Sequence, residues 1–352
     1  VMEEDLLMSS LMAPVTEDIV IMKDEDGLAY WPSYNFNQIG DLSDEKGYKL
    51  LMGAEHNISF SGRKVIPNEK VLNLEQGWQI IPYLREDNAS VEAVFEDIKE
   101  SIIIVKDDIG QVYWPEWGVN SIGNLNPGEG YQIKMTDNIN FNYQANAIEM
   151  PLEMRMQDLE PEYYNVSNIT ESNMTIGIPL DAWEVLPNVM DEIAVCDLQD
   201  RVMGSAVFNG DNMVISVWAN DEHGSMKTGL NEGEYFQIKY RDVANNASYI
   251  LKASAWQQGS NEFFEDEIAI VSWIEQGELI DQGFKVYPVV PNPSTSEAQI
   301  QLFSPKSELV LIELYNILGE LVYQKELNTQ EGMSLHTLPS SIFANGAYEL
   351  KV

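Results

Sequence analysis

Short apolar runs, separated by Gly, Pro, Asn and Asp, recur along almost the whole chain. Runs such as IIIVKD (102–107) are too short for helices and rich in β-branched residues, so they predict strands. Helical spacing is clear in NASVEAVFEDIKES (88–101), where apolar residues from Val91 to Ile98 recur at i, i+3, i+4 and i+7. The pattern therefore predicts a mainly β fold with a few short helices.

Two segments of the chain are copies of one another. Residues 19–50 align without gaps on residues 102–133, a constant shift of 102 − 19 = 83 positions. Each copy reads as an apolar strand, an acidic turn with a glycine, Tyr-Trp-Pro, and a second strand after Gly-Tyr. A further strand is expected at 74–86 of the second copy, and the first copy has no counterpart. We therefore expect the chain to begin inside a repeat, as the C-terminal part of a longer protein.

The remaining patterns divide the chain into further parts. Residues 149–276 contain short alternating strands between turns, which predicts an antiparallel β-sandwich. Few apolar residues occur in EQGELIDQGF (275–284), which reads as a linker. The predicted domains are a truncated first repeat (1–65), a second repeat (66–148), a β-sandwich (149–276), a linker (277–284) and a small C-terminal β-sandwich (285–352).

The C-terminal part begins with KVYPVVPNPSTSEAQIQL (285–302), in which three prolines break the chain before a strand starts. Strands are predicted at AQIQLF (298–303), ELVLIELYN (308–316), ELVYQKEL (320–327) and AYELKV (347–352), with a polar stretch before the last. Gly319 is expected in a hairpin turn, and Asn345-Gly346 in a turn before the final strand.

Three motifs of this part resemble the C-terminal sorting domain, type A-like, of type IX secretion substrates in Bacteroidetes. They are a Tyr-Pro-Asn-Pro-like element, a Leu-Gly turn and a terminal Gly-x-Tyr-x-x-Lys-Val. Here Val-Val-Pro separates the Tyr-Pro from the Asn-Pro. The residues that carry the resemblance are Tyr287, Pro288, Asn292, Pro293, Leu318, Gly319, Gly346, Tyr348, Lys351 and Val352.

The resemblance implies an Ig-like β-sandwich that serves as an export and sorting signal. Its implied partners are the secretion translocon, an outer-membrane shuttle barrel and a sortase that cleaves near residues 275–284. The implied location is the cell surface or the extracellular space. The upstream Tyr-Trp-Pro units also look like modules of large surface proteins of these bacteria.

Charge separates the last part from the rest. The chain carries a net charge of −37, of which residues 285–352 contribute 4 − 7 = −3 and residues 1–283 contribute 16 − 50 = −34. So acidic a chain excludes nucleic acid as a partner, because phosphate binding needs a basic surface. No apolar run reaches the roughly 18 residues of a transmembrane helix.

Candidate catalytic groups are few. The single cysteine, Cys196, lies in the strand-like run EIAVCDL, so a buried structural role is expected. His56, His223 and His336 are far apart in polar, loop-like contexts. We therefore expect no enzymatic activity and assign no metal site. Acidic turns such as KDEDG (23–27) leave Ca²⁺ binding as an alternative, although hairpin chemistry also explains Asp and Gly there.

Aromatic residues recur at equivalent positions of the two copies. Trp31, Tyr34, Trp114 and Trp117 could form exposed platforms for surface glycans, or could belong to the core of each repeat. The first function hypothesis is a non-enzymatic, adhesin-like surface or secreted protein with a C-terminal export signal. The alternative is a set of accessory domains behind a hydrolase domain that lies upstream.

Overall fold

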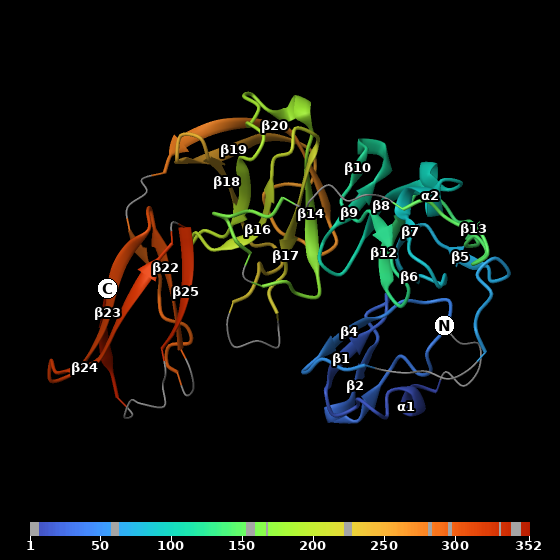
Figure 1. Ribbon diagram of the computed structural model, residues 1–352, viewed down its shortest axis with the longest axis horizontal. Helices are drawn as coiled ribbons and strands as arrows, with labels where there is room; N and C mark the ends of the chain where they lie inside the picture. The colour runs from blue at the N-terminus through green and yellow to red at the C-terminus, as the bar shows by residue number, and fades with distance from the viewer. Residues whose placement is uncertain are drawn as a thin grey trace. The chain divides into compact units, whose positions relative to one another are not determined.

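The structure is a computed structural model that describes residues 7–57, 63–152, 159–166, 168–221, 227–280, 284–294, 298–330, 332–338 and 346–352. It is mainly β, with 46% of residues in strands and 6% in helices, as the sequence predicts. Two compact units, Val1–Asp158 and Leu159–Val352, divide the chain. Figure 1 shows the strands of both units.

The first unit holds the two copies. In the first copy a four-stranded sheet of order β3-β2-β1-β4 is built from the following elements. They are α1 (Met8–Leu11), β1 (Ile19–Lys23), β2 (Ala29–Trp31), the 3-10 helix η1 (Pro32–Tyr34), β3 (Phe36–Asn37) and β4 (Lys49–Met52).

The second copy forms its own sheet, of order β10-β9-β8-β12-β6, which has equivalents of the four strands of the first sheet and one more strand, β6. Two short two-stranded sheets, β11-β7 and β13-β5, complete this copy. Its elements are β5 (Leu72–Leu74), β6 (Gly77–Pro82), β7 (Ala89–Ser90), α2 (Val91–Phe95), η2 (Lys99–Ser101), β8 (Ile102–Lys106), β9 (Val112–Trp114), η3 (Pro115–Trp117), β10 (Val119–Asn120), β11 (Asn124–Leu125), β12 (Gly130–Met135) and β13 (Ile139–Phe141).

The duplication extends to strand register. Lys23 lies opposite Lys49 in the first copy, and Lys106 lies opposite Gln132 in the second, again 83 positions on. The register shifts between Ile19 and Ile21 where β1 pairs with β4. It shifts again between Ile102 and Ile104, the equivalent positions, where β8 pairs with β12. The predicted helix is shorter than its apolar pattern, because α2 ends at Phe95 although Ile98 is still buried.

In the second unit a seven-stranded sheet of order β16-β15-β18-β19-β20-β14-β17 curls into a nearly closed barrel. Its elements are β14 (Asn173–Ile178), η4 (Leu180–Ala182), β15 (Glu192–Cys196), β16 (Val202–Val207), β17 (Met213–Trp218), β18 (Gln237–Asp242), β19 (Ala247–Gln258) and β20 (Ile268–Leu279).

Two features of this barrel differ from the sequence prediction. β14 and β20 pair in parallel, with Thr175 opposite Ile268, whereas we expected an antiparallel sandwich. Every residue of β14 is buried, including the polar Asn173 and Thr175, as in a strand that is covered on both faces. β20 also runs to Leu279 and pairs with β19, so the first three residues of the predicted linker 277–284 are strand, and residues 281–283 lie outside the described residues.

The C-terminal part is a sandwich of two three-stranded sheets, β21-β22-β25 and β24-β23-β26 (Figure 1). Its strands are β21 (Lys285–Val286), β22 (Ala298–Ser304), β23 (Glu308–Asn316), β24 (Leu321–Thr329), β25 (Gly332–Leu338) and β26 (Tyr348–Lys351). β25 replaces part of the predicted polar stretch. Asn345, expected in a turn, lies outside the described residues.

Candidate functional site

The candidate site is the C-terminal sandwich, which carries the three motifs found in the sequence. Its sheets enclose a core that includes Ile300, Leu302, Ile312 and Leu314. Alternation along β23 buries Val310, Ile312 and Leu314 and leaves Leu309 and Leu311 exposed. The predicted small β-sandwich is therefore present, and its core fixes the strands on which the motifs lie.

The first motif runs alongside β22. The Tyr287 N–H donates to the carbonyl of Gln301 at 2.9 Å, and Val290 and Gln299 exchange two backbone hydrogen bonds. Burial raises the pKa of the Tyr287 phenol. These contacts attach the segment to the sheet β21-β22-β25.

The rest of this motif is open to solvent. Pro288, Asn292 and Pro293 are all exposed. Tyr287 is therefore the motif residue that turns inward, and the prolines shape the chain on the outside.

The second motif forms the hairpin turn between β23 and β24. Oδ1 of Asn316 accepts the N–H of Leu318 at 2.9 Å and that of Glu320 at 3.0 Å. Gly319 has a φ of 79°, a left-handed conformation that favours glycine. Ile317 and Leu318 are 82% and 78% exposed, so the turn presents two apolar side chains to solvent.

The third motif lies in β26, which pairs with β23. Tyr348 lies opposite Asn316 and packs against the sandwich core. Nζ of Lys351 lies 4.6 Å from the centre of the Tyr315 ring, within cation–π range. Gly346 and Val352 are exposed at the two ends of this segment.

The structure brings two of the three motifs together. Asn316 opens the Leu318-Gly319 turn and is also the partner of Tyr348, so the second and third motifs meet at one end of the sheet β24-β23-β26. The first motif belongs to the other sheet. The sandwich thus has an exposed hairpin end and a separate segment at its start.

The same hairpin turn recurs elsewhere, which the sequence reading missed. In each case an Asp or Asn accepts the N–H groups two and four residues on, and the third residue on has a positive φ. The signal was the shared spacing of this residue after an apolar strand. The four turns begin at Asp24 (3.0 and 2.9 Å), Asp107 (3.1 and 2.7 Å), Asp197 (2.9 and 2.9 Å) and Asn316 (2.9 and 3.0 Å).

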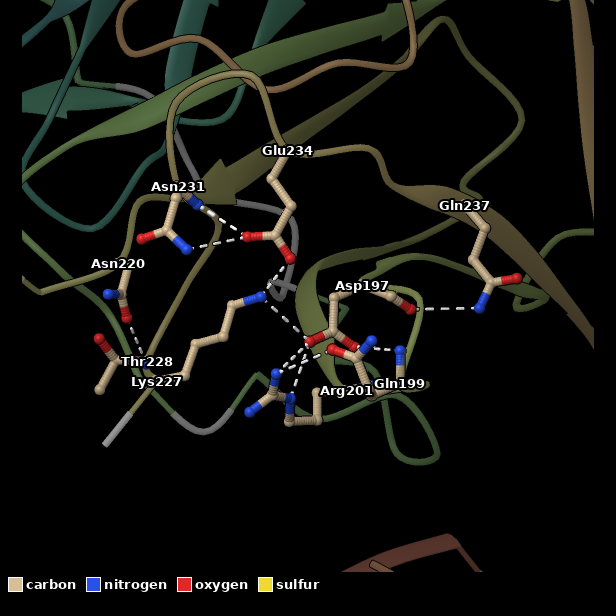
Figure 2. Close-up of polar contacts among 9 residues, drawn as sticks. All are labelled: Asp197, Gln199, Arg201, Asn220, Lys227, Thr228, Asn231, Glu234 and Gln237. Carbon is tan, nitrogen blue, oxygen red and sulfur yellow. Dashed lines mark hydrogen bonds and ion pairs between the residues drawn. The ribbon is translucent and has the colours of Figure 1, made fainter. Parts of the chain in front are cut away.

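Asp197 is the most buried of these turn residues. Its Oδ2 accepts Nε of Arg201 at 2.7 Å and lies 3.4 Å from Nζ of Lys227, which also pairs with Glu234 (Figure 2). Burial raises the pKa of Glu234, but hydrogen bonds from Lys227 and Asn231 outweigh it and hold that pKa below its usual value. Figure 2 shows that the network ties the 197–201 hairpin to the 227–234 loop.

These turns bear on the calcium alternative. One carboxylate oxygen of Asp24 and one of Asp107 are already used by backbone N–H groups. Within the described ranges, no group of three or more His, Cys, Asp or Glu side chains is arranged to hold a metal. Most of NDEHG (220–224), another acidic turn, lies outside the described residues.

The paired aromatics differ between the two copies. Trp114 stacks on Trp117 at 4.3 Å with an interplanar angle of 7°, and Trp114 is 2% exposed. Trp31 meets Tyr34 edge-on at 4.6 Å, and Tyr34 is 70% exposed. Trp114, one of the four candidate ligand-facing aromatics, is therefore buried, whereas Tyr34 is open to solvent.

The cysteine and the described histidines, which were the candidate catalytic residues, lie in different parts of the fold. Cys196 is fully buried in β15, and burial raises its pKa to about 12. His56 contacts Asp18 at 2.7 Å. His336, expected in a loop, lies in β25 opposite Ile300. His223 lies outside the described residues.

Comparison with known proteins agrees with the geometry of the sandwich. Residues 285–352 match the family model described as a secretion system C-terminal sorting domain. No curated protein matches the chain. In the described part of the chain, helices long and apolar enough to cross a membrane are absent. Residues 285–352 are therefore the C-terminal sorting domain of a type IX secretion substrate, which is exported across the outer membrane to the cell surface or extracellular space.

Proposed function

We propose that translocon, shuttle barrel and sortase recognise the sorting domain at its exposed hairpin end. The observation that carries this is the pair Ile317 and Leu318, more than three-quarters exposed beside the β26 terminus. It is contiguous exposed apolar surface, rather than a single exposed apolar residue, that marks protein interaction sites, and these two side chains are adjacent. The turn below them is held by Asn316, so they are presented in a fixed conformation.

Export of two variants tests this proposal. Deletion of residues 285–352 should leave the protein in the periplasm. The double substitution Ile317→Ala and Leu318→Ala should reduce surface or extracellular protein while the purified variant melts at the wild-type temperature. Surface display of the double variant at the wild-type level would refute recognition at the hairpin end.

We further propose that the upstream domains are non-catalytic binding modules of the adhesin type. The first copy supports this role, because Trp31 lies opposite Phe36 across β2 and β3 and contacts Tyr34. Tyr34 and Phe36 are both exposed. Three neighbouring aromatics on one edge form a platform on which the apolar face of a sugar could stack.

A glycan array tests this role. Signal from the intact chain should be lost in Tyr34→Ala, and it should persist in the matched control Trp117→Ala, the same position of the second copy. Absence of any signal, or equal signal from Tyr34→Ala and the wild-type chain, would exclude a glycan platform at this edge.

A further inference from the structure

A small hydrophobic cluster joins the sorting domain to the seven-stranded barrel of the same unit. The barrel strands contribute Ala194, Cys196 and Val202, the segment 159–166 before β14 contributes Tyr163 and Tyr164, and the sorting domain contributes Phe303. Tyr287 and Met333 pack against the same cluster. The rings of Tyr163 and Phe303 meet edge-on, with centroids 5.6 Å apart. The cavity left between these residues is about 30 Å³, room for about one water. A second cavity of about 300 Å³, lined by Val202 and Tyr287 among others, lies between the same two domains, so the close contact is confined to the cluster.

An ion pair borders this cluster. Nζ of Lys285 lies 3.0 Å from Oδ2 of Asp200, at the tip of the β15–β16 hairpin. The other oxygen of Asp200 accepts Nζ of Lys239, and Gln237 donates to it at 2.9 Å. Burial pushes the pKa of Asp200 up, but Lys239 and Lys285 outweigh this and hold it below its usual value. Asp200 therefore stays ionised between two lysines, one from each domain.

The barrel side of the contact is fixed by its own hydrogen bonds. The buried carboxylate of Glu192 accepts three consecutive backbone N–H groups, those of Glu162, Tyr163 and Tyr164, at 2.8–3.0 Å. The guanidinium of Arg241 stacks on the Tyr163 ring at 4.1 Å. Tyr163 is thus held in place by the barrel, and preorganised surfaces bind with less loss of entropy.

We propose that Lys285 and Tyr287 form a docking segment that fastens the sorting domain to the barrel. This docking persists when the chain that connects the barrel to the sorting domain is cut. Both residues belong to or flank the first sequence motif, while the second and third motifs lie on the other sheet. The first motif therefore serves attachment to the cargo. Under the proposed function, the hairpin end stays free for the export machinery, and release of the cargo after cleavage requires this contact to open.

The consequence for Cys196 provides a reporter. It is the single cysteine of the chain and is fully buried in the cluster that includes Phe303. When the sorting domain dissociates, Phe303 no longer covers Cys196, and a thiol reagent can reach the thiol from that side. Protection of this thiol therefore measures docking, independently of any export assay.

The experiment replaces residues 281–283 by a specific protease site in the full chain and cuts the folded protein. We expect the two fragments to co-elute in size-exclusion chromatography and Cys196 to stay unreactive toward a thiol reagent. In the double variant Lys285→Ala and Tyr287→Ala, co-elution should be lost and Cys196 should react. The hairpin variant Ile317→Ala and Leu318→Ala is the matched control and should behave as wild type.

Two results would overturn the docking segment. One is separation of the wild-type fragments after cleavage. The other is co-elution of the Lys285→Ala and Tyr287→Ala fragments with a protected thiol. Thermal melting of each uncut variant reports its folding, and the wild-type cleavage decides the proposal even if that variant fails to fold. The two proposals are distinguishable, because the export assay of the hairpin variant tests recognition by the export machinery, whereas co-elution of the cut fragments tests docking.

Discussion

Gly47 and Gly130, equivalent residues of the two copies, pack on the same strand and against each other. A Cβ added to Gly130 would lie 3.7 Å from the Cα of Gly47 and 3.8 Å from Cγ2 of Ile80 in β6. A Cβ added to Gly47 would lie only 2.5 Å from that methyl group and 3.2 Å from the carbonyl oxygen of Ile81. The Gly47 N–H also donates to the Ile80 carbonyl at 2.8 Å. A methyl group thus fits at Gly130 of the second copy but not at the equivalent Gly47 of the first copy.

This difference predicts that substitution by alanine destabilises the protein at Gly47 but not at the equivalent Gly130. Gly47→Ala should lower the stability of the first unit by about 1–3 kcal/mol, because a β-branched side chain and a backbone carbonyl must move. Gly130→Ala, its matched control, should stay within about 0.5 kcal/mol of wild type. Calorimetry of both variants measures this, and equal losses would contradict the tighter packing of Gly47 against Ile80.

Much of the fold could be predicted from the sequence because its signals are local. The 83-residue shift reappears in the strand registers of both copies, and the strands 308–316 and 298–303 are close to β23 and β22. The hairpin at Gly319 was also expected, since its turn residues lie within five positions.

The features that the sequence did not reveal depend on distant partners. Strand β25 was read as a polar stretch because its positions opposite Ile300 and Leu302 are His336 and Ser334, which mask the alternation. The docking of Lys285 on Asp200 joins residues 85 positions apart, so no local pattern reports it. For the same reason, no pattern indicated that β14 and β20 pair in parallel.

Closure of the barrel depends on a glycine where β16 crosses β17. A Cβ on Gly204 would lie 2.3 Å from the carbonyl oxygen of Ser216, and backbone atoms cannot yield as side chains do. Gly204→Ala should therefore destabilise the second unit by roughly 3 kcal/mol, the upper part of the range for overpacking. The neighbouring Ser205→Ala should have little effect. An unchanged melting temperature for Gly204→Ala would contradict the tight crossing of the two strands.

The turn at Asn316 can be tested against its three relatives. Asp occupies the same place in the other turns, so Asn316→Asp should keep the bonds from the N–H groups of Leu318 and Glu320 and lose only the bond that Nδ2 donates to Oε2 of Glu320 at 2.8 Å. Asn316→Ala removes the Oδ1 atom that accepts both bonds and the Nδ2 group that donates to Glu320, and it should cost about 1 kcal/mol for each hydrogen bond lost. Denaturant unfolding of the sorting domain in the full chain distinguishes the variants, and equal losses for Asp and Ala would argue against a shared turn.

His336 makes the stability of the sorting domain depend on pH. Its Nε2 and the Ser334 hydroxyl are buried without a hydrogen-bond partner among the described residues. Burial, and then the charge of Lys325, lower the pKa of His336 below its ordinary value of 6.5. A base with a lowered pKa is protonated more readily in the unfolded chain, so stability is lost as the pH falls below 6.5.

His336→Leu should remove this dependence. The variant should be more stable than wild type at neutral pH by on the order of 1 kcal/mol, because an unpaired polar atom leaves the core. Its advantage should grow as the pH falls below 6.5, since the leucine cannot take up a proton. Melting curves of both proteins between pH 5 and 8 provide the measurement, with Thr337→Val on the exposed face of β25 as the control. A constant difference across that range would mean that His336 titrates alike in the folded and unfolded chain.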